Sequence, residues 1–259
     1  MSASLGAGLG AAALAGLAAA FALLWLRARR SDARARARLT AATAELERLE
    51  QAFARFAPME LVERVIARGV PTSGERKDVT VLFADLVGFT PLSQSVEPAT
   101  LVRTDRAAHA LEVAVQDAHQ GHISTLIGDG ILALFGALEA NPWQTNDAVQ
   151  AALAMRSELA AYNAELAAGG LPKLALGIGV HRGWGIAGLV GSDELMQFTV
   201  VGNVVSVAAR VQGLTREHGV DVLVTVAAKQ SLDPRFALRA MPPAELKGIA
   251  EPVATFALL

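Results

Sequence analysis

Two apolar segments, each of which carries one aspartate beside glycine, constrain this chain more than any other feature. The first is Val79–Thr90, VTVLFADLVGFT, and the second is Ile127–Phe135, IGDGILALF. Continuous apolar runs of this length are typical of strands that are buried on both faces of a sheet. We expect strands of one sheet to bring Asp85 and Asp129 together at a strand end, where two carboxylates could hold divalent metal.

The overall composition excludes several classes of function. The chain has 259 residues, with 23 Lys and Arg against 25 Asp and Glu, and it contains no cysteine. Because the charges nearly balance, we do not expect nucleic acid as a partner. The lack of cysteine excludes disulfides, thiolate nucleophiles and cysteine metal sites.

The N-terminal residues 1–30 differ from the rest of the chain. Residues 5–26 carry no charge, and at 1.5 Å per residue such a helix is long enough to cross a hydrocarbon core of about 30 Å. We interpret them as a single membrane span. Because positive flanks stay in the cytoplasm, we predict that the body of the protein is cytoplasmic. The flanking arginines are Arg27, Arg29, Arg30, Arg34, Arg36 and Arg38. The alternative is a cleaved signal peptide, which is disfavoured because no basic segment precedes the apolar run.

Residues 31–76 are predicted to form a cytoplasmic helical connector. Apolar residues recur in it at spacings of three, four and seven, which is typical of a short two-stranded coiled coil. These residues are Leu39, Ala42, Leu46, Leu49, Phe53 and Phe56. An amphipathic helix that packs on its own domain is the alternative. Pro58 then begins a second short helix, which ends at Gly69.

Residues 77–259 are predicted to form one α+β domain. Its expected order is β-α-β-β-α-β with additions, a sandwich related to the ferredoxin-like plan. Gly128, Asp129 and Gly130 predict a hairpin turn, and Asn146 predicts the cap of a long helix. The expected strands lie at 79–84, 122–127, 131–135, 173–181, 196–201 and 220–224, the expected helices at 98–118, 146–168 and 204–214, and a closing hairpin at 243–259.

From about Arg55 to Leu259, the chain resembles the class III nucleotide cyclase catalytic domain, the adenylate and guanylate cyclase family. Seven motifs carry the resemblance in the correct order: FAPMELVERV, GERKDVTVLFADLVGFT, LIGDGILALFG, NDAVQAALAMRSELAAYNAEL, GIGVHRGWGIAGLVGS, FTVVGNVVSVAARV and LKGI. The resemblance implies conversion of a nucleoside triphosphate to a 3′,5′-cyclic monophosphate and pyrophosphate. It also implies a dimer whose active sites lie at the interface.

The resemblance assigns roles to individual residues. Asp85 and Asp129 match the metal-binding pair, which implies two Mg²⁺ or Mn²⁺ ions. From the partner chain, Arg210 matches the arginine that stabilises transition-state charge, and Lys247 matches the lysine that meets the terminal phosphates. The amides that match the phosphate cradle, an anion nest, belong to Leu86, Val87, Gly88, Phe89 and Thr90.

Two positions depart from the family pattern. Thr125 stands where adenylate cyclases have the lysine that reads adenine, while Thr199 is compatible with the partner base-reading position. Ser206 replaces the asparagine that orients the ribose, although Asn203 precedes it on the same helical face. Loss of one positioned donor costs roughly 100-fold to 1000-fold in rate in comparable sites.

These observations predict a membrane-anchored, homodimeric adenylate cyclase that acts on ATP. The alternatives are a guanylate cyclase or one of relaxed specificity, and a degenerate nucleotide-binding or regulatory module with little activity alone. A cyclic-dinucleotide synthase on a related sheet is disfavoured because GDGILALFG is not its signature.

Overall fold

A computed structural model describes residues 25, 29, 34, 36–48, 73–89, 91–92, 115, 121–192, 195–249 and 251–259. The chain divides into two compact units, Met1–Glu63 and Arg64–Leu259. The boundaries that we predict at residues 30 and 76 stay predictions.

The described part of the first unit is helical. Residues 36–48 form a helix in which Leu39 and Leu46 are 68% and 47% exposed. Arg29 lies 4.3 Å from the ring centroid of Trp25, a cation–π contact. No helix of the described residues is long and apolar enough to cross a membrane. Apart from Trp25, the predicted span at 5–26 lies outside these residues. The last three coiled-coil positions, Leu49, Phe53 and Phe56, and the predicted helix after Pro58 also lie outside them.

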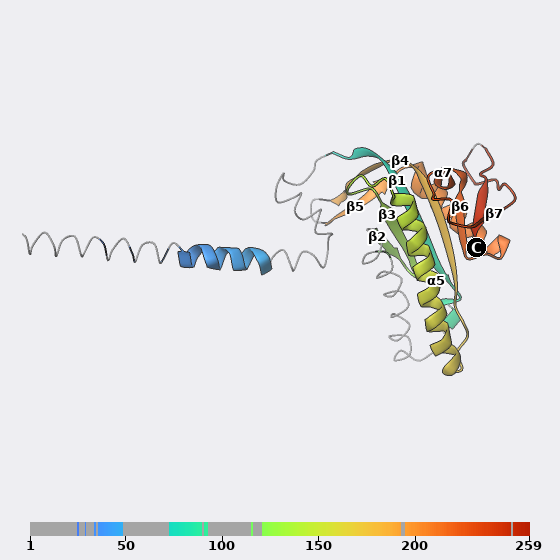
Figure 1. Cartoon of the computed structure of the whole chain (residues 1–259), viewed down its shortest axis with the longest axis horizontal. Helices are drawn as coiled ribbons and strands as arrows, with labels where there is room; N and C mark the ends of the chain where they lie inside the picture. The colour runs from blue at the N-terminus through green and yellow to red at the C-terminus, as the bar shows by residue number, and fades with distance from the viewer. Residues whose placement is uncertain are drawn as a thin grey trace, which may run out of the picture. The chain divides into compact units, whose positions relative to one another are not determined.

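The second unit is built on an eight-stranded sheet in the order β2-β3-β1-β4-β6-β8-β7, with β5 paired to β4. Neighbouring strands are antiparallel except β4 and β6. The strands are β1 (Glu75–Val87), β2 (His122–Ile127), β3 (Gly130–Phe135), β4 (Ala175–Ser192), β5 (Leu195–Val201), β6 (Val222–Thr225), β7 (Leu238–Ala240) and β8 (Thr255–Leu258). The helices are α5 (Gln144–Ala168), α6 (Asn203–His218) and α7 (Val226–Lys229) (Figure 1).

The order β2-β3-β1-β4, with α5 connecting β3 to β4, confirms the predicted α+β fold of ferredoxin-like type. The predicted helix at 98–118 lies outside the described residues, except for Val115, which is helical and fully buried.

The two long helices cover opposite faces of the sheet. Val222 and Val224 of β6 belong to the core cluster that includes α5, whereas Leu223 packs with α6. Because successive side chains of a strand point to opposite faces, α5 and α6 must lie on opposite sides of β6. Figure 1 shows α5 running along the sheet.

Helix α6 lies directly on β4 because the strand carries glycine where the helix crosses it. A Cβ atom added to Gly179 would collide with the backbone oxygen of Ala208 and the backbone nitrogen of Gln212. One added to Gly177 would lie 2.7 Å from the Gln212 side chain. The sequence LGIGV of β4 therefore fixes how closely α6 can approach.

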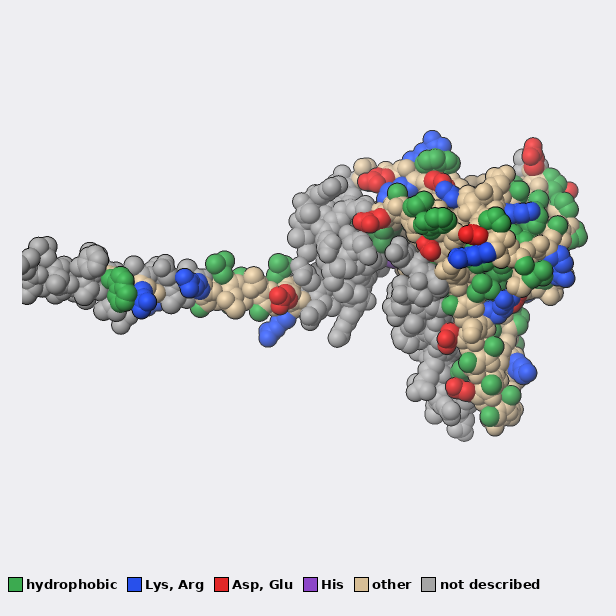
Figure 2. Space-filling view, in the orientation of Figure 1, with side chains coloured by type: hydrophobic (Ala, Val, Ile, Leu, Met, Phe, Trp, Pro, Cys, Tyr) green, Lys and Arg blue, Asp and Glu red, His purple; other side chains and the backbone are tan. Residues whose placement is uncertain are grey.

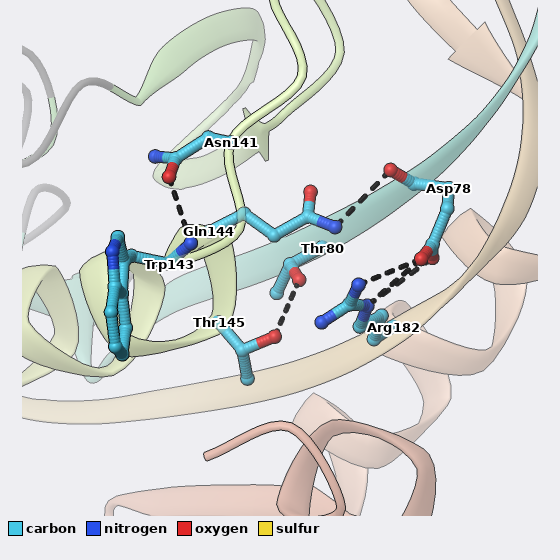
Figure 3. Close-up of polar contacts among 7 residues, drawn as sticks. All are labelled: Asp78, Thr80, Asn141, Trp143, Gln144, Thr145 and Arg182. Atoms are coloured by element: carbon cyan, nitrogen blue, oxygen red, sulfur yellow. Dashed lines mark hydrogen bonds and ion pairs between the residues drawn. The ribbon is translucent and has the colours of Figure 1, made fainter. Parts of the chain in front are cut away.

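A polar cluster fastens the start of α5 to β1 and β4 (Figure 3). Arg182 donates to the Asp78 carboxylate from Nη2 at 2.8 Å and from Nε at 3.1 Å. The hydroxyls of Thr80 and Thr145 lie 3.0 Å apart, and Gln144 Nε2 donates to Asp78 O at 3.2 Å. Because α5, β1 and β4 all contribute, the cluster fixes the register of the helix on the sheet.

The predicted asparagine cap of α5 is wrong. The helix begins at Gln144, and Asn146 lies inside its first turn, where it is buried. Its Oδ1 accepts a hydrogen bond from the Asp233 backbone nitrogen at 2.9 Å. A buried amide needs a partner, and a distant loop supplies one here in place of the helix terminus.

Two strands run further than predicted. β1 continues to Val87, so Asp85 lies within the strand and not at its end. β4 is 18 residues long and includes RGWGIAGLVGS, which lies between the strands that we predicted at 173–181 and 196–201. The many glycines of that segment are typical of a loop. In the structure, however, every residue of β1 pairs with β4, from Glu75↔Ala187 to Val87↔Ala175. Neither α7 nor β7 was predicted.

The face of the second unit that is visible in Figure 2 carries Lys and Arg side chains interspersed with Asp and Glu. This distribution agrees with a net charge of −2.

We predict that Gly179→Ala lowers the free energy of unfolding by about 1–3 kcal/mol, because the new methyl group must push α6 away from β4. Gly213→Ala on α6 is the matched control, since a Cβ there meets nothing within 4 Å. It should raise stability by about 0.5–1 kcal/mol. Urea unfolding of both variants measures the difference, and equal stability would contradict the close packing of α6.

Candidate functional site

One of the two aspartates of the opening motifs lies on β1, and the other lies in the turn that leads into the neighbouring β3. Asp85 of β1 is paired with Gly130 of β3, and Asp129 occupies the two-residue turn between β2 and β3. Gly128, the other turn residue, has φ +63°, a conformation that favours glycine. Leu86 donates a backbone hydrogen bond to Asp129 O at 3.4 Å. The hairpin therefore brings Asp129 beside Asp85, as we predicted.

The two carboxylates repel each other. Burial raises the pKa of Asp85 above its ordinary value, the negative charge of Asp129 raises it further, and Arg216 opposes both effects. A divalent cation between the two groups would relieve this repulsion, and carboxylate oxygens are suitable ligands for Mg²⁺ or Mn²⁺. The pair therefore fits a metal. No group of three or more His, Cys, Asp or Glu that could hold a metal occurs among the described residues.

Arg216 is a site residue that sequence reasoning missed. Its Nη2 lies 2.6 Å from Asp85 Oδ2. In the sequence, Arg216 is only a basic residue near the end of a helix, where a positive charge complements the helix dipole. Nothing in the local pattern indicates a partner 131 residues away.

The segment predicted to cradle phosphate turns later than expected. Leu86 and Val87 still pair with Leu176 and Ala175 of β4. The turn begins at Gly88, which has φ +93°. Phe89 follows in helical conformation and packs against the core, while Thr90 lies outside the described residues.

A second group of predicted residues lies on one side of α6. Asn203 and Ser206 are exposed and Arg210 is partly exposed, and their spacing places them on one helix face. An added Cβ on Gly248 would lie 3.7 Å from Arg210 Nη2. Arg210 is therefore next to the turn that carries the exposed Lys247.

The two groups are not joined within one chain. In the part of the chain that the structure describes, no hydrogen bond or ion pair links Asp85 or Asp129 to Arg210 or Lys247. Arg216 follows Arg210 on the same helix but flanks the other side of its buried face, because the helix repeats every 3.6 residues. One chain therefore presents two separate half-sites.

The predicted base-reading residues lie where β2 meets β5. Gln197 Nε2 donates to Thr125 Oγ1 at 3.1 Å, and Thr199 follows two residues later on the same face of β5. Ser124 sits at a β-bulge and donates to Phe198 O at 3.1 Å, which holds β2 against β5. Sequence reasoning missed Gln197 because its partner, Thr125, is 72 residues away, and its two-residue spacing from Thr199 indicates only a shared strand face.

Known proteins contain domains that are similar to this one. Residues 72–259 match the family model of the adenylate and guanylate cyclase catalytic domain. The adenylate cyclase of Anabaena cylindrica is 32% identical over 196 residues, which are 73% of this chain and 38% of that protein. Adenylate cyclase 1 of Rhizobium meliloti (strain 1021) is 32% identical over 198 residues, 76% of this chain and 30% of that protein. The chain thus spans well under half the length of these relatives.

Solved cyclase structures share the fold. The guanylyl cyclase Cya2 superposes with a TM-score of 0.66 at 26% identity, over 72% of this chain and 94% of that chain. The adenylyl cyclase CyaB from P. aeruginosa has a TM-score of 0.66 at 23% identity, over 72% of this chain and 95% of that chain.

Proposed function

Because this chain belongs to the adenylate and guanylate cyclase catalytic domain family, we propose that it converts ATP to 3′,5′-cyclic AMP and pyrophosphate. The observation that carries the proposal is the placement of Asp85 and Asp129 side by side on β1 and the β2–β3 turn. Two of the relatives are named adenylate cyclases, and this similarity supports ATP as the substrate of the present chain.

Cyclisation needs positive charge beside both the attacking ribose oxygen and the oxygen of the leaving pyrophosphate. The ribose 3′-oxygen loses its proton and bonds to the α-phosphorus, while the bond from that phosphorus to pyrophosphate breaks. Two Mg²⁺ or Mn²⁺ ions at Asp85 and Asp129 would supply positive charge for the attacking and leaving oxygens. Arg210 would stabilise the charge that develops on the phosphate, and Lys247, beside it, would hold the terminal phosphates.

The remaining polar groups position the substrate. Asn203 and Ser206 project from the same side of α6 as Arg210 and would orient the ribose by hydrogen bonding. The serine hydroxyl reaches less far than an amide, so its contribution is smaller. The backbone from Leu86 to Thr90, including the turn at Gly88, would contact phosphate.

A homodimer would complete the site. One chain offers two half-sites, and a two-fold axis brings each half of one chain to the other half of its partner. Large apolar side chains exposed on the β4–β5 ribbon support this pairing, because such patches mark contact surfaces. They are Trp184, Ile186, Val190 and Val201, which share one face of the ribbon and are each between 47% and 59% exposed.

The expected product and assembly are tested together. We expect the full chain to form cyclic AMP from ATP with Mn²⁺, and both Asp85→Asn and Arg210→Ala to be at least about 100-fold slower. Mixing the two slow variants should restore about a quarter of the wild-type rate, because half of the dimers then carry one intact site of two. Chromatographic detection of product measures this. Lack of product from wild type that still binds nucleotide would refute the proposed activity, and failed rescue would refute the homodimer.

Thr125 and Ser206 determine whether the chain is an efficient adenylate cyclase. We predict that Thr125→Lys with Ser206→Asn raises the rate with ATP by about tenfold or more, because both donors act on the base and ribose. The ratio of ATP to GTP turnover measures the effect, with Thr199 unchanged as the second base contact. A double variant that stays inert but binds nucleotide would favour the alternative, a regulatory module. A wild type that prefers GTP would favour a guanylate cyclase.

The N-terminal segments would anchor and pair the chains. Residues 5–26 would span the membrane once with residues 77–259 in the cytoplasm, since six arginines follow the span. Leu39 and Leu46, exposed in a single chain, would meet a second copy in a coiled coil. Holding both chains in one membrane would raise the local concentration of the partner.

We predict that the full chain sediments with membranes and resists carbonate extraction, because a spanning helix is not released by high pH. Deletion of residues 1–30 should release the protein to the soluble fraction, and immunoblotting of both fractions measures this. If the protein that is expressed from the full sequence is instead soluble and shorter at its N-terminus, the apolar segment is a cleaved signal peptide.

A further inference from the structure

The shortest described contact of the metal-binding aspartates is with a cation of the protein itself. Arg216 Nη2 lies 2.6 Å from Asp85 Oδ2, and the Asp85 side chain is 21% exposed. We propose that Arg216 is the built-in counterion of Asp85 in the metal-free protein, and that a divalent cation must displace it to bind. The inference rests on the metal-binding role of Asp85 in the proposed function, and it adds the group that sets how much metal the site needs.

The contact between Arg216 and Asp85 uses the same carboxylate oxygen that a bound metal would use. A guanidinium bonded to a carboxylate oxygen occupies a lone pair that a metal would use, and it places a positive charge where the metal charge must come. Asp129 increases the need for a counterion, because its negative charge acts on the same half-buried carboxyl group. The negative charge of the two aspartates is therefore neutralised in part by an arginine of the same chain.

Arg216 is free to leave the aspartate. Its side chain is 57% exposed, and among the described residues Asp85 is its only polar partner. It also lines a groove of about 850 Å³ beside α6. Arg156 and Arg239 line the same groove, with Asp221 as its one acidic side chain. Displacement therefore breaks one ion pair and moves the guanidinium into open space without unfolding the end of α6.

If Arg216 only oriented Asp85 toward the metal, removal of the arginine would change the metal affinity in the opposite direction. A residue that only holds a metal ligand in place strengthens metal binding, so its loss weakens binding. A competing counterion weakens metal binding, so its loss strengthens it. The sign of the change in Mn²⁺ affinity thus separates the two roles.

The test is Mn²⁺ binding to the full chain without nucleotide, followed by electron paramagnetic resonance of the free ion at fixed pH and ionic strength. We expect Arg216→Gln to lower the apparent Kd by about threefold to tenfold. Arg216→Met, which keeps an apolar stem in the groove, should act in the same direction. Arg216→Lys keeps the charge and should stay closer to wild type. An unchanged or higher Kd in both neutral variants overturns the inference.

Matched controls separate a local contact from a general charge effect. Arg156→Gln removes a positive charge from the same groove, but this arginine pairs with Asp221 and not with Asp85. It should leave the Mn²⁺ affinity unchanged, and an equal tightening would show that net charge alone is responsible and overturn the inference. If a neutral variant folds poorly, thermal unfolding still decides, since Mn²⁺ should raise its midpoint more than that of wild type.

Failure of the inference differs from failure of the proposed function. If Asp85→Asn binds Mn²⁺ as well as wild type does, the metal role of Asp85 is wrong, and the proposed chemistry fails with it. If Asp85→Asn loses binding while the Arg216 variants match wild type, only the counterion role is wrong.

Discussion

The pairing of β1 with β3 on one side and β4 on the other is the constraint on which the site depends. Asp85 stands opposite Gly130 on β3 and Gly177 on β4. An added Cβ on Gly130 would lie 3.2 Å from Ile127 O and 3.3 Å from Ala84 O, so the glycine lets the backbones of the hairpin and β1 approach closely beside Asp85. On β4, Gly177 admits α6. A shift of the register by one residue would turn Asp85 to the other face of the sheet.

Helix α6 links the two half-sites through its position on that sheet. Its inner face packs on β4 by way of Gly177 and Gly179, which fixes both the depth and the rotation of the helix. One flank then presents Arg210 beside the Lys247 turn, and the other presents Arg216 to Asp85. A helix that serves both half-sites ties the geometry of one to that of the other.

The sequence was sufficient for the main elements and for the placement of Asp129, because apolar runs and glycine turns are local signals. It was insufficient for the length of β4, since glycines that admit a neighbouring helix look the same in sequence as glycines of a loop. The predicted capping role of Asn146 is wrong because its side chain instead accepts a hydrogen bond from Asp233, which lies in a distant loop. Arg216 and Gln197 escaped notice for the same reason. Their partners, Asp85 and Thr125, are distant in sequence.

The electrostatics of the site follow from how the fold brings like charges together. Burial and Asp129 both favour the neutral form of Asp85, whereas a role in metal binding requires the charged form. A nearby cation opposes both effects, and the chain places Arg216 there, although the pKa of Asp85 stays above its ordinary value. The arginine favours the charged carboxylate that metal binding requires, while it occupies the place that the metal needs. The same contact therefore prepares the site and opposes its filling, which makes the site responsive to the concentration of metal.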